Sequence, residues 1–336
     1  MHTNKAMSAK FWGVRGSIAS PTPGEIIRAK IVHALRVASG DPNFLKFANS
    51  GEIDTWLDHN IPFPQRSTYG GNTTCVEVRC GEHLIILDMG TGLRRLGNAL
   101  MQETIKNHGL RGTILQSHVH WDHVQGYPFW PQLYMPRGRF KNSFMFYGGR
   151  NWDKSLEEVL RNQMDPPSFP VNHREIEQVG LKMYFETVYD GREITPQDCS
   201  DIQIVTRKLN HPQETYGYRI TYAGKTIVFC TDHEPYAALH RPLVELAQDA
   251  DIFITDCQYT RHEYLGEGGK VQKLGWGHSF PEAIAEAAQA ARVKRIITTH
   301  HDPDASDEHI EEIAASVEKL SGIPTVAAHE GLALHL

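Results

Sequence analysis

Cysteines are scarce in this chain of 336 residues, and none of the five lies in a CxxC pair. An odd number of cysteines without that spacing argues against a framework of disulfide bonds. Most of them fall in apolar, strand-like segments, where a free thiol behaves as a small hydrophobic side chain. The sequence therefore predicts buried free thiols at Cys75, Cys80, Cys199, Cys230 and Cys257.

Long apolar runs and an excess of basic residues are also absent. No apolar run approaches the ~20 residues that a membrane-spanning helix needs, and residues 1–8 lack the apolar centre of a secretory signal. We therefore expect a cytoplasmic protein with no membrane partner. The net charge of −6 argues against a nucleic acid as the main partner, although it leaves room for a local basic groove.

Histidine, by contrast, is abundant, with 19 in the chain, and several metal-binding side chains fall in one short segment. That segment is Ser117-His118-Val119-His120-Trp121-Asp122-His123, and it follows an apolar stretch at 112–116 that is typical of a buried strand. Ligands spaced two apart can reach one point when the backbone leaves a strand and turns into a helix. Three imidazoles and a carboxylate supply the nitrogen and oxygen donors that zinc or manganese prefers. The sequence therefore predicts a divalent metal site here.

This segment resembles the His-x-His-x-Asp-His motif of the metallo-β-lactamase superfamily. Other landmarks of that family match in order: a strand at 83–88 ends in Asp88 before a glycine turn, and His211, Asp232 and His300 each follow a strand-like stretch. The resemblance extends from about residue 10 to the C-terminus. It implies a metal-dependent hydrolase, and its motifs specify the superfamily much more closely than the substrate.

The resemblance implies two divalent metal ions, with zinc as the first expectation and manganese as the second. It assigns one ion to His118, His120 and His211, the other to Asp122, His123 and His300, and a bridging position to Asp232. We also count Asp122 among the catalytic residues. Members that destroy β-lactams often carry a cysteine at the position of Asp232, so an aspartate favours phosphodiester, thioester or lactone hydrolysis.

Two neighbours of these ligands need separate assignments. His300 and His301 are adjacent, and His300 directly follows the strand whose parity it shares, so we assign the ligand to His300. Asp88 is expected to orient a ligand imidazole or to anchor its loop rather than to bind metal.

His278 narrows the class of hydrolase. It lies in Gly277-His278-Ser279-Phe280-Pro281 at an expected helix N-terminus, which resembles the His-Ser-Thr motif of the ribonuclease Z branch. An imidazole there can protonate a leaving alkoxide, and adjacent amides can bind phosphate oxygens. Phe280 departs from the motif because it replaces a hydroxyl residue. The alternative is a structural helix start, with Ser279 as the cap.

The pattern of elements predicts an α/β fold, an αββα sandwich of the metallo-β-lactamase type, which is also what the resemblance implies. Two β-rich halves are flanked by helical segments, and we expect residues 1–336 to form one hydrolase domain. Residues 25–66 look like a helical insertion between two strands, with apolar positions at helical spacing from Ile27 to Ala38. This insertion is expected to cover the active site or to form a homodimer contact.

The favoured function is hydrolysis of a small, cyclic nucleotide phosphodiester by a hydroxide that the two metal ions activate. The segments 11–17 and 69–75 resemble bacterial relatives often assigned as cyclic-nucleotide phosphodiesterases. The alternatives are tRNA 3′-end cleavage as in ribonuclease Z, hydrolysis of a thioester or lactone on the same metal pair, and a binding protein built on an inactive hydrolase. Residues 124–210 contain no clear glycine- and lysine-rich arm of the kind that grips tRNA.

Two further features stay open at this stage. Phe169 either stacks on a nucleobase or anchors a loop, and the cluster Arg137-Gly138-Arg139-Phe140-Lys141 either binds phosphate or is a solvated loop.

Overall fold

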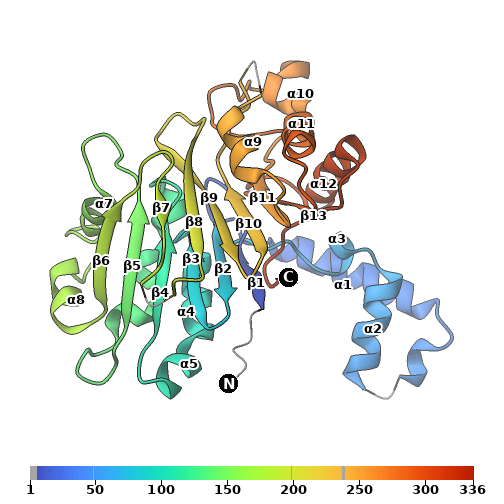
Figure 1. Cartoon of the computed structure of the whole chain (residues 1–336). Coiled ribbons are helices and arrows are strands. Elements are labelled where there is room, and N and C mark those ends of the chain that lie inside the picture. Colours follow the sequence, from blue (N-terminus) through green and yellow to red (C-terminus); the bar gives the residue numbers. More distant parts are fainter. Residues whose placement is uncertain (1–5, 48, 198, 237–238) are drawn as a thin grey trace.

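The computed structural model of the chain describes residues 6–47, 49–197, 199–236 and 239–336. Two seven-stranded sheets form the body of the molecule (Figure 1). The first sheet has the order β14 (Ala333–His335), β1 (Met7–Gly13), β2 (Cys75–Cys80), β3 (His83–Leu87), β4 (Arg111–Leu115), β5 (Ser143–Gly148) and β6 (Lys182–Thr187). The second has the order β13 (Thr325–Ala327), β12 (Ile296–Thr299), β11 (Ile252–Asp256), β10 (Lys225–Cys230), β9 (Thr215–Tyr222), β8 (Gln203–Leu209) and β7 (Glu193–Ile194).

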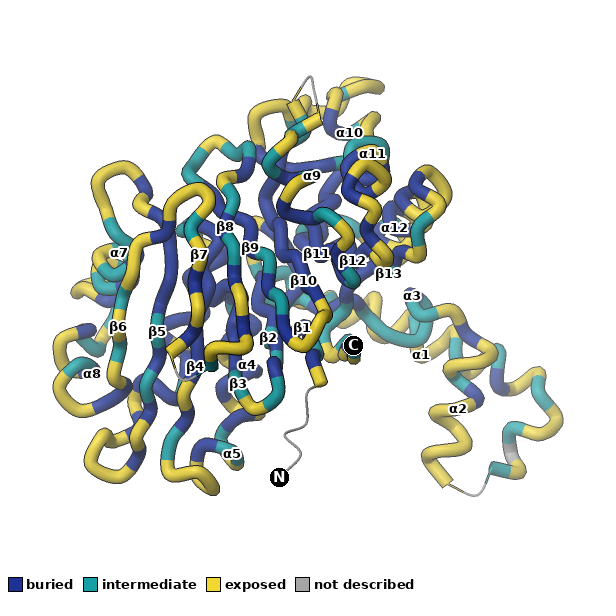
Figure 2. Tube along the Cα trace, in the orientation of Figure 1, coloured by how far each residue is buried: buried dark blue, intermediate teal, exposed yellow. Residues whose placement is uncertain are grey.

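The apolar side chains of the strands separate into faces that pack against different layers. Ile85 and Leu87 of β3 belong to a core between the two sheets, while Leu84 and Ile86 belong to a second core on the outer face. This alternation follows from the two-residue repeat of a strand. Because both faces of β3 are covered, its sequence is a continuous apolar run, and Figure 2 shows the central strands as buried.

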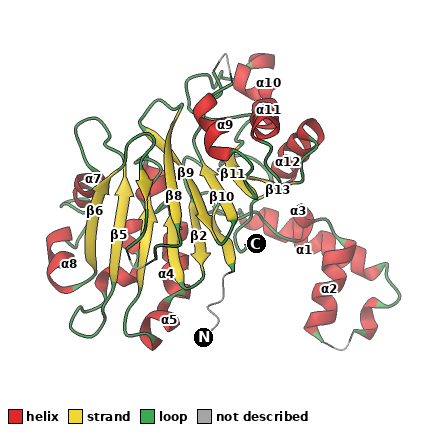
Figure 3. Ribbon diagram, viewed as in Figure 1, coloured by secondary structure: helices red, strands yellow, loops and turns green. Residues whose placement is uncertain are grey.

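Helices cover both outer faces and complete the αββα sandwich, so the predicted fold class is confirmed (Figure 3). The first sheet is accompanied by α4 (Gly92–Ala99), α5 (Met101–Lys106), α6 (Trp121–Val124), η2 (Tyr127–Phe129), η3 (Pro131–Tyr134), α7 (Leu156–Asn162) and α8 (His173–Val179). The second is accompanied by α9 (Arg241–Ala247), α10 (Arg261–Leu265), η4 (Glu267–Gly269), α11 (Pro281–Ala291) and α12 (Asp307–Ser321). The organisation of residues 1–336 as one domain stays a prediction.

The segment 25–66 is helical and joins β1 to β2, which are antiparallel neighbours. It contains α1 (Gly24–Ser39), η1 (Phe44–Lys46), α2 (Ser50–Asn60) and α3 (Phe63–Arg66). We call residues 24–66 the arm, and Figure 1 shows α1 and α2 extending away from the sheets. Lys30 of α1 connects the arm to the helices that cover the second sheet, because its ammonium pairs with the Asp307 carboxylate at the start of α12.

The sequence pattern predicts helices at 152–164 and 237–248, and both begin later in the structure. The first is α7, which begins at Leu156, because Trp152 has a left-handed φ of 57° and Ser155 forms a capping box with Glu158. The second is α9, which begins at Arg241, and residues 237–238 lie outside the described residues. The five cysteines are free, and all except the half-buried Cys199 are buried. Among the described residues, no helix has the length and apolar character to cross a membrane.

Candidate metal centre

The seven predicted ligands come from four segments that meet at one edge of the sandwich. Each segment begins where a strand ends: β4 precedes His118, β8 precedes His211, β10 precedes Asp232 and β12 precedes His300. The short helix α6 then carries Asp122 and His123. Since the chain leaves these strands at the same edge, residues almost 200 positions apart converge there.

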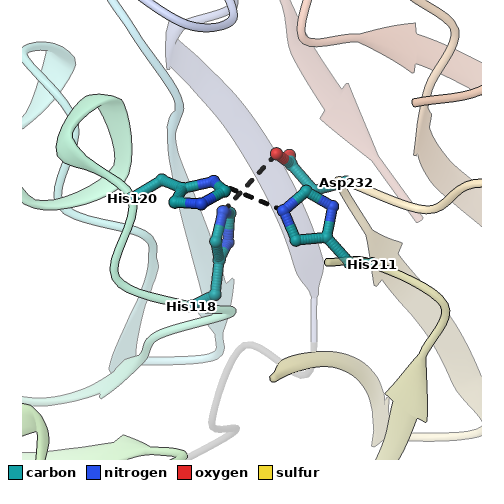
Figure 4. A group of neighbouring side chains, drawn as sticks. All are labelled: His118, His120, His211 and Asp232. Atoms are coloured by element: carbon teal, nitrogen blue, oxygen red, sulfur yellow. Dashed lines mark hydrogen bonds and ion pairs between the residues drawn. The ribbon is translucent and has the colours of Figure 1, made fainter. Parts of the chain in front are cut away.

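One group of donors consists of three imidazoles and a carboxylate, from His118, His120, His211 and Asp232 (Figure 4). Their ligand atoms all lie within 4.8 Å of one another. His211 Nε2 is 3.3 Å from His120 Nδ1, and His118 Nε2 is 3.5 Å from Asp232 Oδ2. The Nδ1–H of His211 donates to the carbonyl oxygen of Gly277 at 3.2 Å, which leaves its Nε2 lone pair directed at the group.

A second group lies against the first and consists of Asp122, His123 and His300. His300 Nε2 is 3.0 Å from Asp122 Oδ2 and 3.1 Å from His123 Nε2. Asp232 Oδ1 reaches this group, at 3.4 Å from His123 Nε2 and 3.2 Å from His300 Nε2. The two oxygens of Asp232 therefore face different groups, as a bridging carboxylate requires.

The donors fit a divalent cation. His118 Nε2 is buried and has no hydrogen-bond partner among the described residues, although it lies in the middle of the first group. Burial lowers the pKa of His118 well below its ordinary value and lowers that of His120 to about 4, so both are neutral at pH 7, the form that coordinates metal. An unpartnered nitrogen in this setting matches the tetrahedral nitrogen and oxygen sites of zinc.

The second group also favours positive charge. Burial lowers the pKa of His123, but the carboxylates of Asp122, Asp232 and Asp88 outweigh burial and raise it well above its ordinary value. Burial raises the pKa of Asp232, and the imidazoles of His300, His123 and His118 reverse that effect and hold it well below its usual range. The same carboxylates that hold a proton on His123 would hold a divalent cation in its place. The role of all seven residues as ligands stays a prediction.

Asp88 lies behind His123 and fixes its ring, as the sequence predicted. Its carboxylate accepts a hydrogen bond of 2.8 Å from His123 Nδ1 and two of 2.7 Å from the backbone N–H and hydroxyl of Ser117. His123 Nε2 is thereby directed at the centre. Asp88, Asp232 and His300 have left-handed φ values of 61°, 56° and 59°, a conformation that costs free energy and is found at functional sites.

The structure separates the two adjacent histidines. His300 lies in the second group, whereas His301 Nε2 contacts the carbonyl oxygen of Ala328 at 2.8 Å on the other side of the loop. The assignment of His300 rather than His301 to the centre therefore agrees with the geometry.

The loop after β1 also contacts the centre, which sequence reasoning missed. The backbone N–H of Ser17 donates to Asp122 Oδ2 at 2.7 Å. Gly16 packs on His300, and a Cβ added at Gly16 would lie 2.4 Å from His300 Nδ1. Any residue type except proline can donate through its backbone N–H, so the identity of Ser17 could not indicate this contact. Only Gly16 could have indicated that the loop comes close to His300.

We expect Gly16→Ala to weaken metal binding by about 10–100-fold, because the added methyl must displace the His300 ring. A competition titration of zinc against a chromophoric chelator measures this change. Gly138→Ala is the matched control, since a Cβ there meets nothing within 4 Å. Equal zinc affinity in the wild type and in Gly16→Ala would contradict the assignment of His300.

His278 lies beside both groups, and its buried Nδ1 lies between two carboxylates with no hydrogen-bond partner among the described residues. Its Nδ1 is 3.9 Å from Asp232 Oδ2 and 3.6 Å from Asp256 Oδ2, and its ring centre is 5.0 Å from that of His300. Asp256 is fully buried at the end of β11 and also accepts from the backbone N–H groups of Ser279 at 2.8 Å and His233 at 3.1 Å. Sequence reasoning missed Asp256, which is an isolated acid without a pattern.

The helix predicted after His278 is α11, which begins at Pro281 with Phe280 at the N-cap. The alternative that Ser279 caps this helix is wrong, because its hydroxyl donates to the carbonyl oxygen of His233 at 2.5 Å. Of the adjacent amides that could bind phosphate, that of Ser279 already donates to Asp256.

Glu234 holds the chain that leads to His278. It is fully buried, and its carboxylate accepts from the Tyr264 hydroxyl at 2.7 Å and from the backbone N–H groups of Gly275 at 2.6 Å and Gly277 at 2.9 Å. Gly277 in turn lies so close to His211 that an added Cβ would be 2.0 Å from its Nδ1. Glu234 therefore sets the position of one ligand and of His278 together, a long-range link that no local sequence pattern contains.

The two features left open by the sequence have structural explanations. Phe169 packs edge-to-face on Phe129 with ring centres 5.7 Å apart, as expected for a loop anchor. The guanidinium of Arg137 donates to the backbone carbonyl oxygens of Gly180, Glu177 and Leu181, so its hydrogen bonds stabilise the fold. Arg137 therefore has a structural role, and phosphate binding by Arg139 and Lys141 stays a hypothesis.

A family model described as a β-lactamase superfamily domain matches residues 83–301. Three solved structures share the fold over nearly the whole chain. The metallo-β-lactamase fold protein YhfI from Bacillus subtilis is 13% identical with a TM-score of 0.62, covering 98% of this chain and 100% of its own. A diphosphatase from the PhnP family is 18% identical with a TM-score of 0.58, covering 98% and 97%. The short form of human tRNase Z is 14% identical with a TM-score of 0.56, covering 97% and 98%.

Proposed function

Because the chain belongs to the metallo-β-lactamase superfamily, we propose that it is a metal-dependent phosphodiesterase that hydrolyses a small nucleotide. We place a cyclic nucleotide first among the substrates and zinc before manganese among the metal ions. The proposed ligands are His118, His120 and His211 for one ion and Asp122, His123 and His300 for the other, with Asp232 shared between them.

The position of His278 is the observation that carries the phosphodiesterase proposal. A departing alkoxide of a nucleotide is a poor leaving group and needs a proton, and His278 supplies one from beside the metal centre. Nδ1 of this imidazole lies between the carboxylates of Asp232 and Asp256, at 3.9 Å and 3.6 Å, and we propose that the ring gives its proton to the leaving oxygen. Hydrolysis of a thioester would not need His278 as a proton donor, because a thiolate departs without protonation.

The remaining residues hold and orient the reacting groups. Two divalent ions at this centre would neutralise the phosphoryl oxygens and lower the pKa of a bound water. Asp88 and Ser17 fix His123 and Asp122, and Glu234 fixes the loop on which His278 lies.

A cavity next to Tyr259 is a candidate site for the part of the substrate that lies away from the metal centre, since neither His278 nor any of the seven ligands lines it. It has a volume of about 690 Å³ and is lined by Tyr259 and Lys273, among others. The ring centre of Tyr259 is 5.9 Å from that of His278, and the Lys273 ammonium lies 4.0 Å from the ring centre of Trp276 and 5.4 Å from that of Tyr259. Glu263, Asp302 and Asp304 also line the cavity, so its surface carries both signs of charge, and we propose the Lys273 ammonium as the group that contacts a negatively charged substrate.

The segment between His123 and His211 supports the same choice over tRNA cleavage. Its described residues form β5 to β8 and the helices α7 and α8, all of which belong to the two sheets or cover them. The described part of this segment thus builds the sandwich and supplies no separate arm for gripping tRNA.

Turnover on one panel of substrates tests the proposal. The zinc- and manganese-loaded protein is offered bis(p-nitrophenyl) phosphate, 3′,5′- and 2′,3′-cyclic nucleotides, a tRNA precursor and a thioester. We expect cleavage of the phosphodiester and of a cyclic nucleotide, with the tRNA precursor and the thioester intact. Cleavage of the thioester alone, or of the tRNA precursor alone, would contradict the proposal.

A further inference from the structure

The arm has a small core of its own, which leaves one side of α1 without cover. Ala38, Trp56 and Ile61 form this core, and the Trp56 ring packs on Phe44 with ring centres 4.9 Å apart. The Trp56 indole also donates to the Asp41 carboxylate at 2.7 Å. The arm is thus an ordered unit, and its exposed surface has a defined shape.

The uncovered side of α1 is an aliphatic ridge. Ile27, Ile31 and Leu35 are spaced four apart on one helix face, and they are 49%, 55% and 62% exposed. Ile26 and Val32 flank them at 43% and 37%. Figure 2 shows most of α1 as exposed. A contiguous aliphatic surface of this kind on a soluble protein marks an interaction site.

The arm cannot turn this ridge inward, because α1 is fixed at its inner side. The ammonium of Lys30 donates to the carbonyl oxygens of Pro64 at 2.6 Å and Ser67 at 2.5 Å, and it pairs with Asp307. Phe63 of α3 packs on Tyr69 with ring centres 5.0 Å apart. These contacts set the rotation of α1, so the ridge needs a cover from outside the chain.

The charges on the two helices of the arm indicate what kind of partner covers the ridge. The exposed charged side chains of α1 near the ridge are mainly basic, Arg28 and Arg36, whereas those of α2 are acidic, Glu52, Asp54 and Asp58. Ile53 of α2 adds an aliphatic side chain that is 37% exposed. Asp58 pairs with Arg66 of the same arm, which leaves Asp54 to face a basic partner. One arm therefore carries two helices of opposite charge, with the aliphatic ridge on α1 and one exposed aliphatic side chain on α2.

We propose that two copies of this chain associate through their arms, with α1 of each copy packed on α2 of the other. A two-fold axis makes both contacts at once, because each arm supplies one basic and one acidic helix. The ridge of each copy is then covered by α2 of the other copy, and the basic side chains of α1 lie near the acidic side chains of α2. A basic amphipathic helix also suits an anionic membrane, but the acidic α2 beside it would be repelled by such a surface.

Light scattering coupled to size-exclusion chromatography tests this interface on the full chain. The wild type is expected to have twice the 38.0 kDa mass of one chain. The variant Ile31→Glu/Leu35→Glu is expected to have the mass of one chain, with an unchanged circular dichroism spectrum. Ile105→Glu is the control, because Ile105 lies on α5 and is 44% exposed, and it should keep the dimer mass.

Charge reversal then tests whether α1 meets α2. Arg36→Glu and Asp54→Arg should each weaken dimerisation by about tenfold, and the double variant should recover most of the loss. A wild type of 38.0 kDa at every concentration would overturn the proposal. A dimer mass for the variant Ile31→Glu/Leu35→Glu would also overturn it. So would a monomeric wild type that co-floats with phosphatidylglycerol vesicles in a density gradient.

Discussion

Asp232→Asn is expected to abolish hydrolysis and to remove bound metal. The substitution keeps the size of the side chain but replaces a carboxylate whose two oxygens face both groups of ligands, at 3.5 Å from His118 and 3.2 Å from His300. Loss of the shared charge removes several kcal/mol of electrostatic stabilisation, which corresponds to a fall in kcat of about 1,000-fold or more. Metal content by mass spectrometry and turnover of bis(p-nitrophenyl) phosphate are measured on the same sample.

The choice of asparagine and of the control follows from the backbone. Asp232 has a left-handed φ of 56°, which asparagine tolerates and alanine does not, so the variant adds little strain. Asp249 has a similar φ of 54° and pairs with Arg292 away from the centre, so Asp249→Asn is the matched control. If Asp232→Asn bound two equivalents of zinc and turned over normally, Asp232 would not bridge the groups.

His278→Ala is expected to lower kcat strongly while the metal stays bound. For a cyclic nucleotide we expect a loss of about 100- to 10,000-fold, the usual contribution of a general acid. For bis(p-nitrophenyl) phosphate the loss should be less than about tenfold, because a nitrophenolate departs without a proton. The difference between the two substrates separates proton donation from a structural effect.

The same variant also tests a competing role for His278. Its ligand atom lies within 4.8 Å of those of Asp232 and His300, so this imidazole has the position of a further metal ligand. If His278→Ala lost metal and its kcat fell equally on both substrates, His278 would be a metal ligand and its proposed role as general acid would be contradicted. His262→Ala is the control, because His262 on α10 is exposed and pairs with Glu267 of η4.

The grouping of the seven residues could be predicted from the sequence because they occupy regular places. Each ligand follows an apolar strand or opens the turn after one, and the order of His118, His211, Asp232 and His300 along the chain matches a known family. Strand ends are visible in a sequence, since apolar runs end abruptly at polar residues. The topology then brings these ends to one edge.

The residues that hold the centre in place could not be predicted. Glu234 and Asp256 are single acids whose partners are backbone N–H groups 23 to 43 positions away, and Ser17 acts through its own backbone N–H. Such contacts depend on how loops from different strands meet. The alternative role of Ser279 as a helix cap fails for the same reason, because its hydroxyl donates to the carbonyl oxygen of His233, 46 positions away.

A titration of the metal-free protein with zinc tests the central claim most directly. The rate of bis(p-nitrophenyl) phosphate hydrolysis is measured after each addition. We expect no hydrolysis without metal and a rate that rises to a plateau at two equivalents of zinc for each chain. Hydrolysis at full rate without metal, or no hydrolysis at any zinc content, would contradict a phosphodiesterase built on these seven ligands.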